Sequence, residues 1–253
     1  MKDHIVLGVD IGGSGIKGGL INIKSGEMVS ERHRIPTPQP ATPQAVAKTF
    51  GDLVRHFKWQ GPMGVGFPAI VHHGKALSAS NIDKSWINTD IQLILSNVSQ
   101  CPVHVLNDAD AAGIAVMHYG VGKKEKGLVL ILTIGTGIGS ALFIDGHLVP
   151  NTELGHIYLK GQKEIAEKYT SNLARKRDEL DWRTWGLRFN EYLVHVNHIF
   201  SPDLIILGGG GSKHWEKYAD EITINTHVKP ASLLNKAGAI GAARYAWLME
   251  EGE

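Results

Sequence analysis

Residues 9–16 read Val9-Asp10-Ile11-Gly12-Gly13-Ser14-Gly15-Ile16, and residues 132–139 repeat the pattern as Leu132-Thr133-Ile134-Gly135-Thr136-Gly137-Ile138-Gly139. Each stretch follows an apolar run typical of a strand and leads into a second apolar run, so both predict a glycine-rich hairpin. Glycine lets backbone N–H groups approach an anion closely and adopts positive φ without strain. Two such loops facing each other across a cleft would hold one chain of phosphates from both sides.

The composition is that of an ordinary globular protein with one large core or two modest ones. The chain has 253 residues, 43% hydrophobic and 20% charged, with a formal net charge of +1. No global field therefore favours nucleic acid or a membrane surface as a partner. Cys101 is the single cysteine, which excludes an intrachain disulfide and a cysteine-based zinc site. The chain leads into a strand without a signal peptide or a membrane-length apolar run, so we expect a cytoplasmic protein.

Strands and helices alternate along the chain in the manner of an α/β protein. We expect strands at residues 5–9, 20–23, 28–34, 63–67, 103–106 and 204–207. We expect helices at residues 43–59, 90–99, 108–119 and 237–249, and mainly helical structure over residues 164–200. The repeated hairpin indicates two similar halves, a domain at residues 1–107 and a domain at residues 108–253. The last helix, within residues 237–250, is expected to return to the first domain.

The first glycine stretch predicts a phosphate-binding loop. In this interpretation the backbone of Gly12, Gly13 and Gly15 and the polar groups of Ser14 bind phosphate oxygens. Asp10 would hold a hydrated Mg²⁺, which prefers a carboxylate plus waters, and Lys17 would neutralise a phosphate. The alternative is a glycine-rich hairpin with an exposed lysine. The stretch is neither a Walker loop nor a Rossmann fingerprint, because no Gly-Lys-Ser/Thr ending follows and a strand succeeds the glycines.

Two further glycine runs predict contacts to the phosphoryl donor. The second hairpin offers Gly135, Thr136, Gly137 and Gly139. A run after the buried strand at 204–207 offers Gly208, Gly209 and Gly210, which could cradle a nucleotide or a distal phosphate. The alternative for this run is a flexible connection between a strand and a helix.

A polar pair marks the end of the strand at 103–106. Functional residues concentrate at the carboxyl ends of such strands, so Asp108 is a candidate general base and Asn107 a candidate amide for orienting a hydroxyl. The alternative is that either side chain only caps the following helix. Asp110 suits the first helical turn, where a carboxylate interacts favourably with the helix dipole.

Other polar positions near strands are weaker candidates. Glu153 and His156, after the second hairpin, could accept hydrogen bonds from neighbouring sugar hydroxyls, or could belong to a plain polar turn. Gly66 lies in a tight strand exit that would let a small ligand approach the backbone. His72 and His73 are expected to be surface residues, because adjacent strand side chains point to opposite faces and no third ligand is evident.

Taken in order, these motifs resemble the ROK sugar kinases of the actin-like ATPase superfamily. The resemblance covers nearly the whole chain and implies a two-domain actin-like, ribonuclease H-like fold with a cleft between the domains. It implies that Asp108 deprotonates a sugar hydroxyl and that Asn107, Glu153 and His156 contact the sugar. It also implies Mg²⁺ as cofactor and a homodimer.

One departure separates this chain from the usual pattern of the family. The family pattern continues after Glu-x-Gly-His with a cysteine-rich zinc cluster, but no cysteine lies beyond Cys101. We therefore expect no zinc on His156, and a third sugar-contacting glutamate has no secure position. Members without the cluster are similar in several stretches, among them Asn81-Ile82-Asp83-Lys84-Ser85-Trp86. This resemblance implies phosphoryl transfer from inorganic polyphosphate, and also from ATP, to the 6-hydroxyl of glucose.

The charge of the segment from residue 160 to residue 188 is relevant to which phosphoryl donor the protein uses. It carries eight cationic side chains against five acidic ones: Lys160, Lys163, Lys168, Arg175, Lys176, Arg177, Arg183 and Arg188. This is either a basic path for a long polyanion or a solvated surface of mixed charge.

The sequence is also compatible with other functions. An ATP-dependent glucokinase and a kinase for mannose or an amino sugar are the alternatives within the family. A sugar-responsive regulator would need a DNA-binding segment ahead of the first strand, and a non-catalytic sensor could dispense with Asp108.

Overall fold

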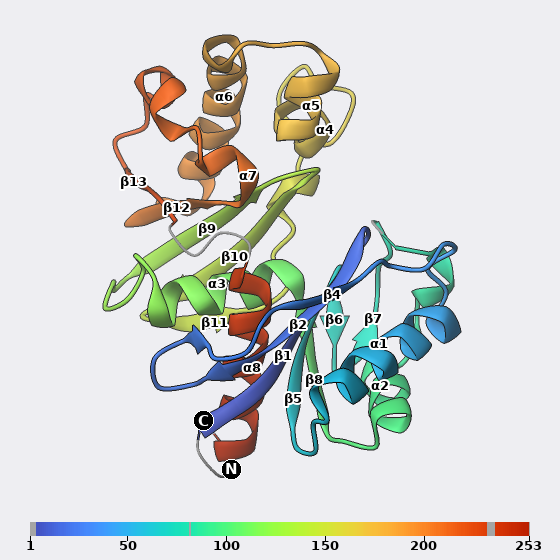
Figure 1. Cartoon of the computed structure of the whole chain (residues 1–253). Coiled ribbons are helices and arrows are strands. Elements are labelled where there is room, and N and C mark those ends of the chain that lie inside the picture. Colours follow the sequence, from blue (N-terminus) through green and yellow to red (C-terminus); the bar gives the residue numbers. More distant parts are fainter. Residues whose placement is uncertain (1–3, 81, 232–235, 253) are drawn as a thin grey trace. The chain divides into compact units, whose positions relative to one another are not determined.

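The computed structural model describes residues 4–80, 82–231 and 236–252 (Figure 1). Asn81, quoted above, lies outside the described residues. The chain divides into two compact units, unit 1 with Met1–Tyr119 and Lys236–Glu253, and unit 2 with Gly120–Asn235. Among the described residues, no helix has the length and apolar character required to cross a membrane.

Unit 1 is built on a six-stranded sheet. Its strands are β1 (Ile5–Gly12), β2 (Gly15–Asn22), β3 (Glu27–Met28), β4 (His33–Ile35), β5 (Met63–Phe67) and β8 (Val103–Asn107). The order is β3-β2-β1-β5-β8, with β4 also paired to β2. β1 and β2 form an antiparallel hairpin that brings Gly12 opposite Gly15, whereas β5 and β8 continue the sheet in parallel with β1. The first glycine stretch is therefore the tip of a hairpin, as its pattern predicted.

Helices cover both faces of this sheet. They are α1 (Pro43–Phe57), α2 (Ile91–Ser99), α3 (Asp108–Tyr119) and α8 (Ala237–Glu251). Leu7, Val9 and Ile11 alternate along β1 and join a buried core with residues of α1 such as Phe50. Between β5 and α2 lie β6 (Val71–His72), β7 (Lys75–Ala76) and the short helix η2 (Lys84–Trp86).

α8 packs on the opposite face of the sheet, where glycines in the strands leave room for the helix backbone. A Cβ at Gly8 of β1 would lie 1.9 Å from the carbonyl oxygen of Ala239, and one at Gly64 of β5 would lie 1.7 Å from that of Ala242. Gly241 of α8 makes the same approach to α3, because its Cβ would lie 1.6 Å from the carbonyl oxygen of Ala111. The division of the chain follows Tyr119 rather than Asn107 because α3 packs along α8 inside unit 1.

Unit 2 repeats the sheet with the same strand order. Its strands are β9 (Leu128–Ile134), β10 (Ile138–Ile144), β11 (His147–Val149), β12 (Leu204–Gly208) and β13 (His227–Pro230). They run in the order β11-β10-β9-β12-β13, with β9 and β10 as the antiparallel hairpin and β12 parallel to β9. Each unit thus places its glycine-rich loop between its first two strands. We define loop 1 as residues 12–15 and loop 2 as residues 135–137.

The helices of unit 2 are shorter and more broken than the sequence indicated. They are α4 (Ala166–Thr170), α5 (Asn172–Arg177), α6 (Trp182–Phe200) and α7 (Gly209–Ser212), with η3 (Leu154–His156), η4 (Trp215–Lys217) and η5 (Ala219–Glu221). The helical stretch expected at 164–200 is interrupted because Ser171 caps α5 and Asp181 caps α6. The connection expected after β12 is a helical turn, α7, and the strand expected at 28–34 splits into β3 and β4.

Candidate functional site

Three polar side chains form hydrogen bonds to backbone carbonyl oxygens of loop 1. The Thr37 hydroxyl donates to the carbonyl oxygen of Gly12 at 2.5 Å, and Nη2 of Arg34 donates to that of Ser14 at 2.6 Å. Gln39 Nε2 lies 3.5 Å from the carbonyl oxygen of Gly13. These bonds engage the carbonyl oxygens of the loop, so a negative ligand at the tip would meet N–H groups rather than carbonyls.

Arg34 is a cation at loop 1 that the sequence analysis did not select. β4 pairs with β2 so that Arg34 lies opposite Lys17, and a Cβ on Gly15 would lie 2.6 Å from Nε of Arg34. Glycine at position 15 therefore lets the Arg34 side chain lie against loop 1, and a larger residue there would displace it. The spacing of Lys17 and Arg34 along the chain does not indicate that they lie together, because their proximity depends on the pairing of β2 with β4.

Asp10 and Lys17 form an ion pair at the base of loop 1. They are opposite each other in the β1–β2 hairpin, and Nζ of Lys17 lies 3.1 Å from Oδ2 of Asp10. The Asp10 carboxylate is adjacent to Gly238 at the start of α8, where a Cβ would lie 3.1 Å from its Cγ. The side chain remains 21% exposed, so a hydrated ion could reach it. One carboxylate with access to water is a donor set that suits Mg²⁺.

Asn107 and Asp108 adopt different roles at the start of α3. Oδ1 of Asn107 accepts from the N–H groups of Ala109 and Asp110 at 2.8 and 3.1 Å, and its Nδ2 donates to the carbonyl oxygen of Ala69 at 3.0 Å. Asn107 therefore caps the helix, and the second N–H of its amide is the group that could contact a sugar. Asp108 is the first residue of α3 and is only partly buried.

Gly66 provides the space beside Asp108. It lies in β5, and a Cβ there would approach Cα of Asp108 to 3.5 Å and the Ala111 side chain to 3.3 Å. A larger residue at this position would press on the start of α3. The structure thus brings Gly66, Asn107 and Asp108 together at the carboxyl ends of β5 and β8.

Loop 2 is closed by its own backbone and by the start of α5. The N–H of Gly135 donates to the carbonyl oxygen of Gly137 at 2.9 Å, and the N–H of Leu173 donates to that of Gly135 at 3.2 Å. A Cβ on Gly135 would meet nothing within 4 Å, so open space adjoins this residue. Thr136 is exposed at the tip. Gly139, by contrast, lies within β10 opposite Thr133 and is not part of the loop.

The second glycine run adjoins loop 2. Gly209 has a φ of +75°, and a Cβ there would lie 2.6 Å from the carbonyl oxygen of Ile134, so only glycine fits. Gly208 ends β12 and pairs with Thr133, which aligns the run with β9. Gly210 is exposed, and Asn172 Nδ2 is the nearest atom that a Cβ on it would meet, at 4.0 Å.

The Glu-x-Gly-His stretch is fixed against β10. Ser140 Oγ donates to the carbonyl oxygen of Thr152 at 2.6 Å and accepts from the N–H of Leu154 at 3.0 Å. Leu154 is buried in the core of unit 2, and a Cβ on Gly155 would lie 2.3 Å from the carbonyl oxygen of Ile138. The spacing of the motif follows from these contacts, because its middle residues pack inward while both polar ends stay accessible.

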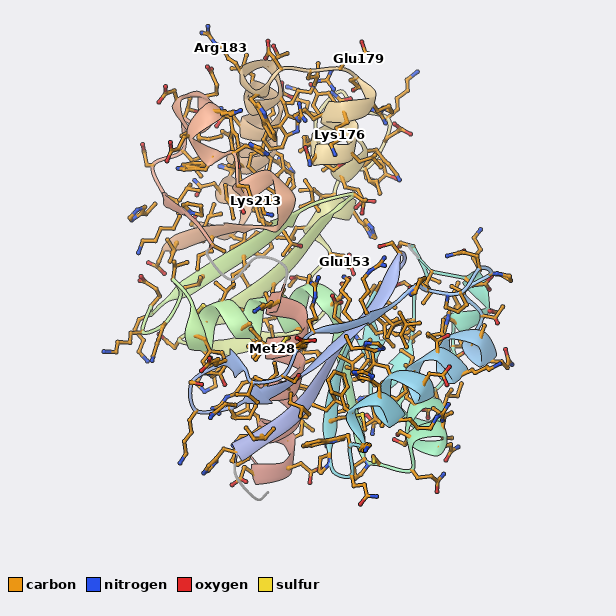
Figure 2. All side chains as sticks on the ribbon, in the orientation of Figure 1. Met28, Glu153, Lys176, Glu179, Arg183 and Lys213 are labelled. Atoms are coloured by element: carbon orange, nitrogen blue, oxygen red, sulfur yellow. The ribbon has the colours of Figure 1, made fainter. Side chains whose placement is uncertain are left out.

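Glu153 (Figure 2) is an acid of unit 2 whose pKa is raised. Burial raises its pKa above 4.5, repulsion from Glu167 raises it further, and His156 opposes the shift. Nδ1 of His156 lies 3.8 Å from Oε2 of Glu153. Two carboxylates and an imidazole therefore interact here, a set that can accept hydrogen bonds from neighbouring hydroxyls.

Glu167 is the second residue that the sequence analysis did not select. Its Oε2 accepts from the N–H of Ile138 at 3.2 Å, and a Cβ on Gly137 would lie 2.2 Å from the same oxygen. The side chain is 13% exposed. Its contacts cross from α4 to loop 2, and no local pattern in the sequence indicates them.

The structure places the sequence-selected residues in groups within each unit. Unit 1 carries loop 1 with Asp10 and Lys17, and Gly66 with Asn107 and Asp108. Unit 2 carries loop 2 with the run at 208–210, and Glu153 with His156. His72 and His73 are exposed, and no cluster of three His, Cys, Asp or Glu able to hold a metal occurs within residues 4–80, 82–231 and 236–252.

Proteins named as polyphosphate glucokinases and glucokinases are among those with sequences similar to this one. Residues 6–172 match the model of the ROK family. The chain is 45% identical over 237 residues to the polyphosphate glucokinase of Mycobacterium tuberculosis strain CDC 1551 / Oshkosh, covering 93% of this chain and 89% of that protein.

Solved structures agree over nearly the full length. The inorganic polyphosphate/ATP-glucomannokinase of Arthrobacter sp. strain KM has a TM-score of 0.91 and 46% identity, covering 97% of this chain and 99% of that one. A ROK family glucokinase from Streptomyces griseus, solved with glucose and AMPPNP, shares the fold with a TM-score of 0.82 and 22% identity, covering 96% and 99%. These neighbours confirm the expected α/β sugar kinase fold, and the chain belongs to the ROK family.

Proposed function

We propose that this protein transfers a phosphoryl group from inorganic polyphosphate, and also from ATP, to the 6-hydroxyl of glucose. The observation that carries the proposal is the likeness, at 45–46% identity over more than nine-tenths of the chain, to proteins named for this donor and this sugar. The two glycine-rich loops, each between the first strands of equivalent sheets, support a phosphate ligand.

The proposed reaction is an in-line displacement at the terminal phosphorus. Asp108 accepts the proton as the sugar oxygen attacks, the new O–P bond forms, and the bond to the leaving phosphate breaks. The leaving group is a polyphosphate shortened by one unit, or ADP. Asn107 caps α3 itself, so the helix cap does not depend on the Asp108 carboxylate.

Sugar contacts are assigned to Asn107 and Gly66 in unit 1 and to Glu153 and His156 in unit 2. Glu167 is proposed as the third sugar-contacting glutamate, since its charge acts on Glu153. Holding several hydroxyls fixes the direction of the 6-hydroxyl and lowers the entropic part of the barrier.

Donor contacts are assigned to both glycine loops, Lys17 and residues 208–210. Mg²⁺ fits Asp10 through bound water and, when present, supplies positive charge to the transferring phosphoryl group. Lys17 would hold the Asp10 carboxylate in place and neutralise a phosphate.

A direct comparison of donors and sugars tests the proposal. Initial rates are measured with long-chain polyphosphate and with ATP, first with glucose and then with mannose. We expect turnover of glucose with both donors and faster turnover with polyphosphate. Activity with ATP alone would remove the polyphosphate assignment and leave an ATP-dependent glucokinase. Faster turnover of mannose than of glucose would favour the mannose alternative.

Glu153 predicts a characteristic pH dependence. Because its pKa is raised, its carboxyl takes up a proton at a higher pH than an ordinary glutamate and loses acceptor capacity there. As the pH falls, we expect KM for glucose to begin to rise while the pH is still above 4.5. In Glu153→Gln the KM is raised at neutral pH and lacks this step, and Glu179→Gln, an exposed change, behaves as wild type.

The same residue predicts a stability effect of defined sign. The native state binds the Glu153 proton more tightly than the unfolded state does. Ionisation of the carboxyl therefore destabilises the native state above the raised pKa. Below 4.5 the carboxyl is protonated in both states, and this destabilisation is absent. Glu153→Gln should therefore raise the unfolding temperature relative to wild type at pH 7 more than at pH 4. An equal difference at both pH values would contradict the assignment.

We also propose a cytoplasmic homodimer. Leu187 and Val194 are exposed on the same face of α6, two turns apart, and would be covered by a second copy of the chain.

A further inference from the structure

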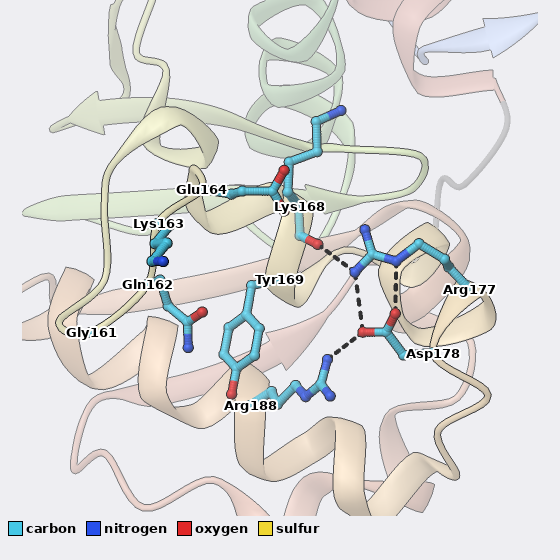
Figure 3. A pocket seen from close by; sticks show the side chains of 9 residues that line it. All are labelled: Gly161, Gln162, Lys163, Glu164, Lys168, Tyr169, Arg177, Asp178 and Arg188. Atoms are coloured by element: carbon cyan, nitrogen blue, oxygen red, sulfur yellow. Dashed lines mark hydrogen bonds and ion pairs between the residues drawn. The ribbon is translucent and has the colours of Figure 1, made fainter.

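A pocket of about 460 Å³ lies on unit 2 among α4, α5 and α6 (Figure 3). Four cationic and two acidic side chains line it: Lys163, Lys168, Arg177, Arg188, Glu164 and Asp178. The basic segment at 160–188 therefore does not spread its charge evenly, because half of its cations gather at one place. Lys176 and Arg183, from the same segment, lie elsewhere on the surface (Figure 2).

Asp178 fixes the two arginines. Its Oδ1 accepts from Nε of Arg177 at 2.7 Å, and its Oδ2 accepts from Nη2 of Arg177 at 3.1 Å and from Nη1 of Arg188 at 2.6 Å. These bonds hold the pKa of Asp178 down to about 2, so the carboxylate stays ionised. A guanidinium has five N–H donors, so each arginine keeps donors beyond those used here. The pair is thus preorganised for an anion.

Tyr169 makes the pocket a poor site for a nucleotide base. The Arg188 guanidinium lies 4.7 Å from the centre of its ring and covers one face. Tyr169 is the one aromatic residue among the described lining residues, so the pocket offers charge and hydrogen bonds rather than a stacking slot.

Direct hydrogen bonds connect the wall of the pocket to loop 2. Glu167 of α4 accepts from the N–H of Ile138, the residue directly after loop 2, and the N–H of Leu173 of α5 donates to the carbonyl oxygen of Gly135. Lys168 follows Glu167, and its carbonyl oxygen accepts from Nη2 of Arg177 at 3.1 Å. A ligand extending from loop 2 over α4 would therefore reach the two arginines without leaving unit 2.

We propose that this pocket binds the distal phosphates of a polyphosphate chain whose reacting end lies at loop 2, an inference that rests on the proposed function. A polyphosphate carries repeated negative charge and no base or ribose, which matches four cations and no stacking slot. Arginine pairs with phosphate oxygens through two parallel N–H bonds, and lysine contributes as a point charge. ATP, with three phosphates, does not need this pocket.

The test uses the double variant Lys163→Gln/Arg177→Gln and the matched control Lys176→Gln/Arg183→Gln. Both remove two positive charges from exposed side chains of the same segment. In the pocket variant we expect KM for long-chain polyphosphate to rise about tenfold. KM for ATP, KM for glucose and the inhibition constant of tripolyphosphate against ATP should stay within about twofold of wild type. The control should match wild type throughout.

Three results would overturn the proposal: an unchanged KM for long-chain polyphosphate, an equal loss with ATP or tripolyphosphate, or an equal loss in the control. Calorimetric titration of long-chain polyphosphate into each protein separates this inference from the proposed function. If wild type uses ATP but not polyphosphate, the proposed donor is wrong. In that case the proposal that the pocket binds polyphosphate holds only if wild type still binds polyphosphate and the pocket variant does not. Unfolding temperatures equal to wild type verify that the variants are folded.

Discussion

Asp108→Asn should lose most turnover while keeping the fold and the binding of glucose. Removal of a general base lowers rates by about 10²–10⁴-fold. The fold should survive because the cap of α3 is the neighbouring Asn107, whose Oδ1 accepts from two N–H groups of the first turn. The measurements are kcat with polyphosphate and with ATP, glucose affinity by calorimetry, and the unfolding temperature. Near-normal kcat would remove Asp108 from the mechanism.

Asp90→Asn is the matched control for this prediction. Asp90 caps α2 through a bond from the N–H of Leu93 at 2.9 Å, so the same chemical change is made at the start of another helix in unit 1. Asparagine caps helices about as well as aspartate, so stability and kcat should both remain near wild type. A similar loss of kcat in both variants would point to a general effect on unit 1 rather than to proton transfer.

Gly64→Ala should destabilise unit 1 more than any surface change. The added Cβ would lie 1.7 Å from the carbonyl oxygen of Ala242 and 2.2 Å from its carbonyl carbon, so α8 would have to move away from β5. Overpacking of a core costs about 1–3 kcal/mol, and this change belongs at the upper end, about 3 kcal/mol, because backbone must shift. For a chain of this size we expect the unfolding temperature to fall by roughly 6–12 °C.

Gly61→Ala is the control for packing. It lies just before β5, and an added Cβ there would make only ordinary contacts of 3.4–3.7 Å with the Trp59 ring. We expect an unfolding temperature within about 2 °C of wild type, as for most surface substitutions. Thermal unfolding followed by circular dichroism compares the two variants. If Gly64→Ala matched wild type as well, the close approach of α8 to β5 would be wrong.

The fold class was predictable because its signals are local. The alternation of Leu7, Val9 and Ile11 indicated a strand, and the glycines after it indicated a hairpin rather than a strand followed by a helix. Since both hairpins show the same pattern, the sequence also indicated related halves, and the two sheets have the same strand order. The unit that contains α3 was not predictable, because contacts of Gly241 with α3 join segments far apart in the chain.

The site was predictable only where its residues are neighbours in sequence. Loop 1, the pair Asn107 and Asp108, and the Glu-x-Gly-His stretch were selected from motifs, and their roles stay predictions. The choice between Asn107 and Asp108 as helix cap required coordinates, because both residue types cap well. Arg34 and Glu167 approach the loops through a strand pairing and a helix packing that spacing along the chain does not encode.

The placement of α8 in unit 1 has a consequence for synthesis of the protein on the ribosome. Unit 2 is continuous in the chain, at Gly120–Asn235, so all of it emerges before the segment that completes unit 1. Until α8 emerges, Gly8 of β1 and Gly64 of β5 lack the helix that packs directly on them. The later half of the polypeptide can therefore mature first, while the earlier half waits in an aggregation-sensitive form for its final fifteen-residue helix.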